Sequence, residues 1–403
     1  MPTIHQTVLS DPLSYRDELL ELGMANGLDA AGVTAAVAWP DARRRMEERR
    51  AAGLHAGMGF TYRDPARATD PTRALPDARA LLVGARGYRR RPPTGDDAPG
   101  GEGRQGRVAA YAWVDHQEVL RGALKAIAAR LKADGWRARV MIDDNGLVDR
   151  EAAHRAGIGW FGKNANLLLP GRGSWFVLGA VVTSAPLPAD AEPVADGCGT
   201  CTRCLDGCPT GAIVAPGVVD ARRCLDGCPT GAIVAPGVVD SRRCLSWLLQ
   251  IDGDFPRPFR EAVGDRIYGC DDCQEVCPPN RRLEVAGVPD AEPGAVAEVD
   301  LLGMLAATDD QLLARHGEWY IPRRDPDHLR RNALVVLGNV ARRDDVEVTA
   351  VLARYLRHPN PLLRSHAAWA ARRSGRGELL DGLERDPAVS SELGQPAPEV
   401  TAP

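Results

Sequence analysis

All ten cysteines of this 403-residue chain fall within residues 198–277, and they constrain the fold more than any other feature. The first group is spaced C-x2-C-x2-C-x3-C-P and comprises Cys198, Cys201, Cys204 and Cys208. The last group is spaced C-x2-C-x3-C-P and comprises Cys270, Cys273 and Cys277. A segment this rich in Cys, Gly and Pro buries little apolar surface, so we expect an inorganic centre to hold it together.

The spacing of the first group is that of bacterial ferredoxins, in which the fourth cysteine ligates the other cluster. It therefore predicts two [4Fe-4S] clusters. The expected ligands of cluster 1 are Cys198, Cys201, Cys204 and the remote Cys277. The expected ligands of cluster 2 are Cys208, Cys244, Cys270 and Cys273. Structural zinc also uses four cysteines, but its usual pattern is two well-separated C-x2-C pairs, so the spacing favours iron.

A tandem duplication complicates the second ligand set. Residues 204–223 recur as residues 224–243, and the two copies differ only at Ala221 and Ser241. Two copies do not make a solenoid, which needs about three or more repeats. Removal of either copy leaves eight cysteines, so Cys228 could replace Cys208, or Cys224 could replace Cys244.

The rest of the chain divides into further regions. Residues 1–190 alternate helical and strand patterns, which indicates an α/β domain. Residues 191–290 hold the iron–sulfur cysteines. Short amphipathic stretches in residues 300–385 resemble a HEAT-like helical repeat, and we expect residues 386–403 to be a disordered tail.

Charge and hydropathy narrow the possible functions. The net charge of -4 does not indicate a general nucleic-acid binder, but residues 311–375 hold twelve Arg against six Asp and Glu. No apolar run reaches the length of about 18 residues needed to span a membrane. The N-terminus lacks the pattern of a secretory signal, so we expect a cytoplasmic protein with reduced thiols.

Two motifs in the α/β domain bear on ligand binding. Residues 157–162 match G-x-G-x-x-G, but a helix is expected before them and a strand after them, the reverse of a dinucleotide site. These glycines would still allow a flat ligand to approach closely, and the adjacent Lys163 is either a solvated lysine or a ligand contact. Asp143 ends a predicted strand; it is either a turn residue or a carboxyl group at the functional edge of the sheet.

Together these motifs resemble the epoxyqueuosine reductase family of cobalamin- and iron–sulfur-dependent tRNA-modifying enzymes. The resemblance extends from about Tyr15 to Leu380 and rests on the order of the motifs as well as on the cysteines. The motifs are Tyr111-Ala-Trp, Ile142-Asp143, Asp149-Arg-Glu151, Gly157 to Asn164, Gly173-Ser-Trp-Phe176, Arg266 to Cys273 and Arg331 to Asn339.

The resemblance implies a reductase-type cobalamin-binding α/β domain, a ferredoxin-like two-cluster domain and a C-terminal HEAT-like repeat. It implies that Asp143 is the catalytic proton donor. The residues implied to line the cobalamin are Gly157, Gly159, Gly162, Lys163, Asn164, Ser174 and Trp175.

The implied reaction is the reduction of epoxyqueuosine to queuosine at the wobble position of tRNA. Its implied partners are the anticodon stem-loop, gripped by the helical repeat, and an external low-potential electron donor; we expect a monomer. Two other functions remain open at this point: another corrinoid iron–sulfur reductase, such as a reductive dehalogenase, and a non-enzymatic iron–sulfur protein that binds tRNA.

Overall fold

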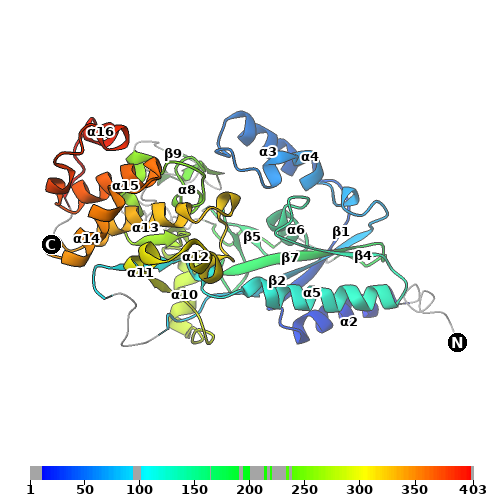
Figure 1. Ribbon diagram of the computed structural model, residues 1–403. Coiled ribbons are helices and arrows are strands. Elements are labelled where there is room, and N and C mark those ends of the chain that lie inside the picture. Colours follow the sequence, from blue (N-terminus) through cyan, green and yellow to red (C-terminus); the bar gives the residue numbers. More distant parts are fainter. Residues whose placement is uncertain are drawn as a thin grey trace. The chain divides into compact units, whose positions relative to one another are not determined.

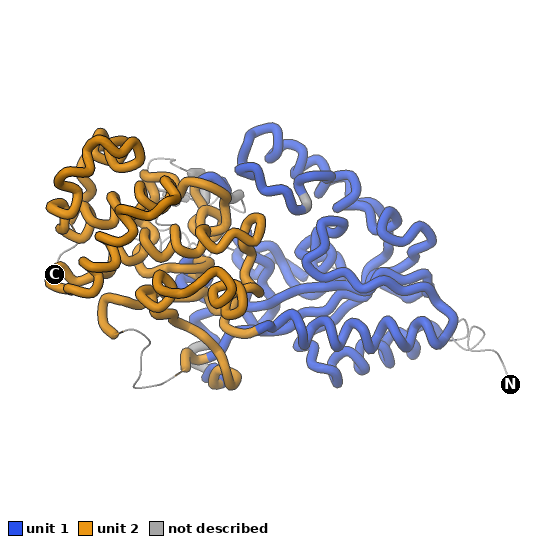
Figure 2. Tube along the Cα trace, in the orientation of Figure 1, with its two compact units in different colours: residues 1–90, 115–242, 272–289 blue, residues 91–114, 243–271, 290–403 orange. Residues whose placement is uncertain are grey.

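The computed structural model describes residues 11–93, 101–163, 165–189, 194–199 and 240–400, with four short strands between 213 and 239. These residues form two compact units (Figure 2). The first unit comprises residues 1–90, 115–242 and 272–289, and the second comprises residues 91–114, 243–271 and 290–403. The cysteine-bearing stretch is divided between the two units.

The first unit is built on a four-stranded sheet in the order β1–β2–β7–β4. The strands are β1 (Ala30–Ala35), β2 (Ala80–Gly87), β7 (Phe176–Thr183) and β4 (Ala138–Ile142). Every neighbouring pair is antiparallel, with Ala85 opposite Leu178 and Ile142 opposite Gly179. The alternation of helix and strand was predicted correctly, but the sheet is not the parallel one that such alternation usually gives.

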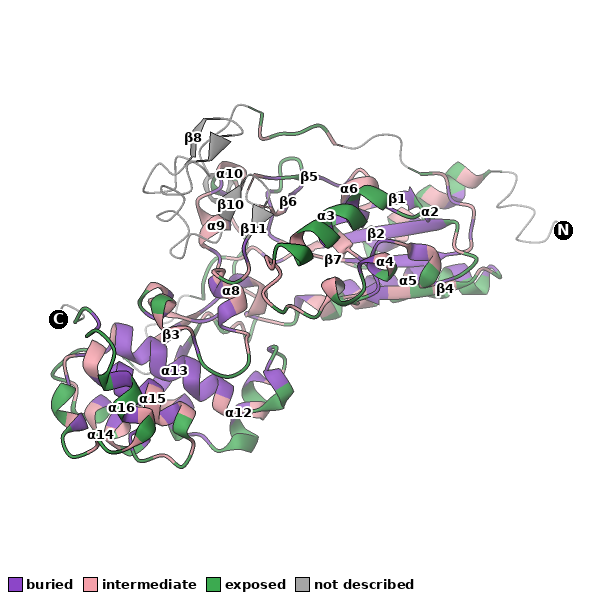
Figure 3. Ribbon diagram, turned by 90° about the horizontal axis from the view of Figure 1, so that it is seen from above, coloured by how far each residue is buried: buried purple, intermediate pink, exposed green. Residues whose placement is uncertain are grey.

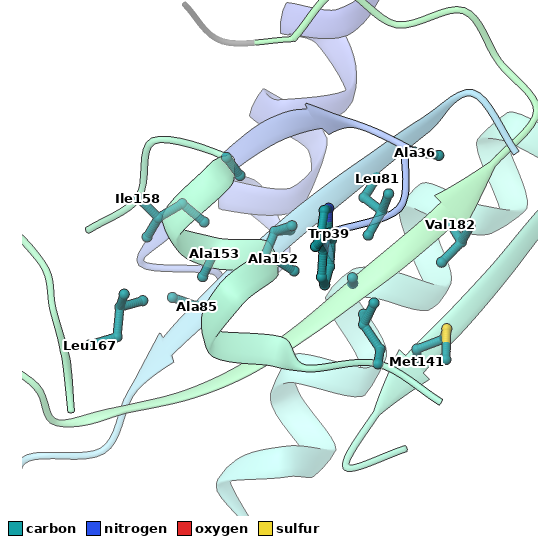
Figure 4. Packing of buried hydrophobic residues seen from close by; sticks show 14 of the residues in the cluster. Ala36, Trp39, Leu81, Ala85, Met141, Ala152, Ala153, Ile158, Leu167 and Val182 are labelled. Atoms are coloured by element: carbon teal, nitrogen blue, oxygen red, sulfur yellow. The ribbon is translucent and has the colours of Figure 1, made fainter. Parts of the chain in front are cut away.

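Helices cover both faces of this sheet (Figure 1). Helices α2 (Pro12–Ala25) and α5 (His116–Ala133) pack on one face, where α5 buries a stripe formed by Leu120, Leu124, Ile127 and Leu131. Each such fully buried side chain stabilises the fold by about 2 kcal/mol. The other face is covered by α6 (Asp149–Arg155) and by Trp39, which precedes α3 (Pro40–Ala51) (Figure 4). Because both faces of the sheet are covered and shielded from water, β2 is apolar along most of its length.

The second unit combines a small sheet with helices. Strand β3 (Gln105–Val108) pairs in parallel with β12 (Arg266–Tyr268) and antiparallel with β13 (Glu298–Asp300). The larger helices of this unit are α11 (Leu301–Ala306), α12 (Asp309–His316), α13 (Asp327–Val340), α14 (Val346–Tyr355) and α15 (Pro361–Arg373). Helix α13 is buried along most of its length and packs against α15 (Figure 3).

The C-terminal tail differs from our prediction. Residues Pro387–Leu393 form helix α16, whose N-cap Asp386 accepts hydrogen bonds from two backbone N–H groups. Its Val389 is fully buried, and Glu392 binds Arg257 at 2.8 Å. A cap, a buried apolar side chain and an ion pair fix this segment, which the sequence suggested would be disordered.

The remaining elements are short. They are the helices α4 (Pro65–Ala68), α8 (Leu245–Leu248), α9 (Asp272–Glu275) and α10 (Pro278–Ala286), and the strands β5 (Trp160–Phe161), β6 (Leu167–Leu168), β8 (Ile213–Ala215), β9 (Val218–Val219), β10 (Ile233–Ala235) and β11 (Val238–Val239). Among the described residues, no helix combines the length and the apolar character that crossing a membrane requires.

Candidate cofactor and iron–sulfur site

The antiparallel pairing brings three chain segments to one edge of the large sheet. Strands β2 and β4 end there and β7 begins there, since Gly87 lies opposite Phe176 and Ile142 opposite Gly179. Asp143 follows β4 at this edge, is exposed, and has a φ of 49°. Because a left-handed backbone is costly for a residue with a side chain, it persists where the surrounding structure imposes it, often at functional sites.

A second carboxyl group lies near Asp143. Asp149 begins helix α6, and its Oδ1 atom is buried with no hydrogen-bond partner among the described residues. Burial raises the pKa of Asp149 well above its usual range, and the carboxylate of Asp143 raises that pKa further. Burial and the neighbouring carboxylate therefore both favour the neutral, protonated form of this side chain.

Each glycine of the G-x-G-x-x-G motif has a local structural reason. Gly157, with a φ of 70°, ends helix α6 in the left-handed conformation. A Cβ on Gly159 would lie 2.3 Å from the carbonyl oxygen of Leu168, so only glycine lets β5 and β6 pair. Gly162 donates its N–H to the carbonyl of Asn166 at 2.8 Å and starts the turn between them. As predicted, a helix precedes the motif and a strand follows it.

This β5–β6 hairpin supports the cysteines. Trp160 and Leu168 pack against the buried Cys277, and Cys198 packs on the same cluster. The Nζ of Lys163 donates to the carbonyl of Gly199 at 3.1 Å, so Lys163 contacts the loop that follows Cys198. The structure thus brings together Cys198 and Cys277, two of the four cysteines that we predicted for cluster 1.

The turn before β7 is held by aromatic and basic side chains. Trp175 is 1% exposed, meets Tyr88 edge-on at 5.9 Å, and lies under the guanidinium of Arg89 at 4.6 Å. Its Nε1 is nevertheless buried without a hydrogen-bond partner among the described residues. Ser174 is buried beside it.

The structure describes only some of the other cysteines that we predicted as cluster ligands. Cys273 belongs to the first unit and accepts a hydrogen bond from Asn166 at 3.7 Å, whereas Cys244 and Cys270 belong to the second unit. The predicted site residues outside the described part of the chain are Asn164, Cys201, Cys204, Cys208, Cys224 and Cys228. Within the described part, no three potential metal ligands converge.

Comparisons with known proteins agree with this geometry. The family model of a 4Fe-4S double cluster binding domain matches residues 197–226 and 221–280. An epoxyqueuosine reductase of Xanthomonas campestris pv. campestris is 32% identical, over 91% of this chain and 98% of its own length. That of Bacillus subtilis is 31% identical, over 92% of this chain and 90% of its own length. The chain belongs to the epoxyqueuosine reductase family.

Solved structures of the family match the fold. A crystal structure of epoxyqueuosine reductase with an epoxyqueuosine-modified tRNA stem-loop superposes with a TM-score of 0.79 and 29% identity, over 94% of this chain and 96% of that one. The Bacillus subtilis enzyme, described with its catalytic aspartate loop swung out of the active site, gives a TM-score of 0.77 and 29% identity, over 94% of this chain and 96% of that one.

Sequence reasoning missed three residues at this site. Asp149 was part of a family motif but was given no role of its own, because nothing local showed that its carboxyl would be buried. Gln274 and Asn280, which bind Ser174, were also missed. Their only signal was position, since Gln274 lies between Cys273 and Cys277 and Asn280 shortly after the latter.

Proposed function

We propose that this chain reduces epoxyqueuosine in tRNA to queuosine, using cobalamin and two [4Fe-4S] clusters. The observation that carries the proposal is the extent of the family match, which includes 98% of the Xanthomonas campestris enzyme and 96% of the chain solved with a modified tRNA stem-loop. A match of this extent includes the sheet edge, the hairpin and the cysteine segments together. We place the protein in the cytoplasm, as a monomer supplied with electrons by an external low-potential donor.

The chain's residues fit both cofactors. Thiolates are the ligands of iron–sulfur clusters, and Cys198 and Cys277 meet around Trp160. For cobalamin, the sheet edge offers two buried polar atoms that the described residues leave unsatisfied, Asp149 Oδ1 and Trp175 Nε1. A reduced corrinoid supplies a nucleophilic cobalt that no side chain can provide.

We assign the cobalamin contacts to the hairpin and to the turn before β7. The hairpin contacts are Gly157, Gly159, Gly162, Lys163 and Asn164, and the turn contacts are Ser174 and Trp175. Support comes from the contact between Arg150 and Ala165 at 3.2 Å, which holds the hairpin tip beside the start of α6, where Asp149 lies. The tip of the β5–β6 hairpin therefore lies near Asp149, and both belong to the first unit.

The chemistry requires protons at a defined place. Removal of the epoxide oxygen as water takes two electrons and two protons, and breaks both carbon–oxygen bonds of the ring. Asp143 is exposed at the sheet edge on a strained backbone, as suits a carboxyl that must reach a substrate. We assign Asp143 to proton donation.

We assign tRNA contact to the helical unit. Arg323 and Arg324 are exposed and consecutive, with φ values of 52° and 59°. They lie in a strained turn just before α13, where Arg323 binds Asp252 at 2.6 Å and Arg324 donates to the carbonyl of Gly317 at 2.6 Å, so a phosphate would compete with these partners. Guanidinium groups bind phosphates without sequence preference, and the modified base must leave its stack to reach a pocket.

The test is conversion of epoxyqueuosine tRNA by anaerobic, cobalamin-loaded protein, measured by mass spectrometry of the digested nucleosides. Asp143→Asn should bind both cofactors and lose turnover by about 100-fold or more, the usual contribution of a general acid. The matched control is Asp144→Asn, which keeps the oxygen that accepts the N–H of Gly146 at 2.7 Å and should stay active. A wild-type chain that leaves epoxyqueuosine unchanged would refute the proposal.

A further inference from the structure

A buried polar network joins the segment between two cysteines to the turn before β7. Its members are Tyr88, Ser174, Gln274 and Asn280, each at most 8% exposed. Asn280 Oδ1 accepts the backbone N–H of Ser174 at 2.8 Å. Asn280 Nδ2 donates to Ser174 Oγ at 2.9 Å and to the carbonyl of Gln274 at 2.8 Å. One amide therefore fixes two segments about a hundred residues apart in the sequence.

Gln274 adds a second connection between the same segments. Its Nε2 lies 3.0 Å from the carbonyl oxygen of Ser174, 3.1 Å from Ser174 Oγ and 3.1 Å from Tyr88 Oη. Tyr88 in turn donates its backbone N–H to the carbonyl of Trp175 at 2.9 Å. Buried amides that lose such partners are costly, so the network holds one arrangement rather than several.

The turn before β7 leaves no room for a side chain at Gly173. A Cβ on Gly173 would lie 1.9 Å from Asn280 Oδ1, and the φ of Gly173 is 67°. Glycine is therefore required both by the backbone and by the approach of the amide. The helices that carry the two amides, α9 and α10, span only four and nine residues, so we expect tertiary contacts to hold them in place.

We propose that Gln274 and Asn280 are positioning residues that hold the Cys273–Cys277 segment in register with the Ser174–Trp175 turn, and so fix the path of electrons to the cofactor. The proposal rests on the proposed function, because it takes that turn as part of the cobalamin site. Electron transfer slows steeply as donor and acceptor separate, so a loosened cysteine segment would lower the transfer rate while its clusters stayed bound.

The first readout is independent of activity. Hydrogen exchange of residues 272–282 is followed by mass spectrometry in the cluster-loaded, cobalamin-free chain. Asn280→Ala and Gln274→Ala should each speed exchange there about tenfold, the effect of losing a buried hydrogen bond. Asn339→Ala is the matched control: Asn339 is also a buried amide, donating to the carbonyl of Arg260 at 2.7 Å in the second unit. It should leave exchange in residues 272–282 unchanged.

The second readout is electron transfer. Bound cobalamin is reduced through the clusters by a photoreduced flavin in an anaerobic stopped-flow instrument. Both variants should keep the wild-type iron and cobalt content and transfer electrons more slowly than wild type, because loss of the amide contacts would let the cysteine segment move away from the turn. In turnover, kcat should fall while KM for tRNA stays constant, since the network does not face the substrate.

Wild-type exchange in both variants would overturn the proposal, and so would fast exchange with electron transfer at the wild-type rate. If Asn280→Ala loses iron, the two readouts on Gln274→Ala decide, because Gln274 makes separate hydrogen bonds to the same turn. Failure of the underlying function is distinguishable, because it would appear in the wild-type chain as absent cobalamin binding or unchanged epoxyqueuosine, and it would remove this proposal as well.

Discussion

Mild acid should weaken the helical unit through its buried histidines. Burial lowers the pKa of His328 in α13 to about 3, with Arg331 adding repulsion. Burial likewise lowers the pKa of His316 at the end of α12 to about 4. Burial also lowers the pKa of His366 in α15 well below its usual value. All three are therefore neutral in the folded protein at neutral pH.

The size of the effect follows from linkage between protonation and folding. The unfolded chain binds a proton on each histidine below a pKa of 6.5, while the folded chain does not until far lower pH. The contribution of these histidines to the free energy of unfolding is therefore constant above pH 6.5 and falls as the pH drops toward 4. At pH 5, His328 and His316 each cost about 2 kcal/mol, because each pKa unit corresponds to about 1.4 kcal/mol. Their sum is a large part of a typical stability of about 5–15 kcal/mol.

The assay is urea unfolding of the anaerobic protein at pH 7 and pH 5, for wild type and for His328→Gln. The variant should lose about 2 kcal/mol less than wild type between the two pH values, since its side chain does not titrate. Any constant cost of the substitution cancels in this difference. Asn339→Ala, a non-titrating change in the same helix, should lose as much as wild type. Equal losses for His328→Gln and wild type would show that the histidine is already protonated or hydrated in the fold.

Four further predictions concern the site. In urea unfolding, the stability of Asp149→Asn relative to wild type should be higher at pH 7 than at pH 4. The reason is that a buried acid with a raised pKa destabilises the wild-type fold once the same group ionises in the unfolded chain. A difference that does not change with pH would contradict this. The Gly159→Ala variant should contain less iron than wild type, as measured by a colorimetric iron assay. Its added Cβ would lie 2.3 Å from the carbonyl oxygen of Leu168 and would force apart the two strands of the hairpin beside the cysteines. Arg323→Ala should reduce the salt dependence of tRNA affinity by about one unit of slope in filter binding, whereas a non-contacting residue would leave the slope unchanged. Cys244→Ala should lose about half of the eight irons of two [4Fe-4S] clusters while Cys224→Ala keeps them all; the reverse result would make Cys224 the ligand in place of Cys244.

Local signals in the sequence were sufficient for some of the helices and strands of the first unit. Strand β2 (Ala80–Gly87) begins with a run of small and apolar residues, the pattern typical of a buried strand, and that part of it is buried. The glycine motif was read as unsuited to a dinucleotide because of the elements around it, and that order is present. These features depend on periodicity and on neighbours in the sequence, which a sequence displays directly.

Long-range pairing was not readable from the sequence. The antiparallel order of the large sheet depends on contacts between strands far apart in the chain, and β3 pairs with β12 and β13, which both lie more than 150 residues further along the chain. The Arg excess of the C-terminal region was read as surface charge, yet Arg331 is fully buried and donates to the carbonyls of Ile251 and Gly253. Composition counts charges but does not show which of them face solvent.

The end of the duplicated segment gives a physical reason to prefer Cys244 over Cys224. Asp240, in the second copy, is 4% exposed and binds Arg242 at 2.7 Å, and the N–H of Ser241 donates to the carbonyl of Leu54 at 2.9 Å. These residues are thereby anchored to the first unit, immediately before the chain enters the second unit at Arg243.

The N–H of Ser241, in the second copy, occupies this anchor, and the chain leaves the first unit directly afterwards. Since the second copy holds it, the cysteine that follows at the boundary is Cys244, and α8 (Leu245–Leu248) starts immediately after it. Cys224 is twenty residues upstream of that boundary in the sequence. To replace Cys244 as a ligand, it would have to reach the same cluster without the anchor that leads the chain there. An insertion upstream of an intact junction agrees with this arrangement, and it supports our prediction that Cys244 rather than Cys224 is a cluster 2 ligand.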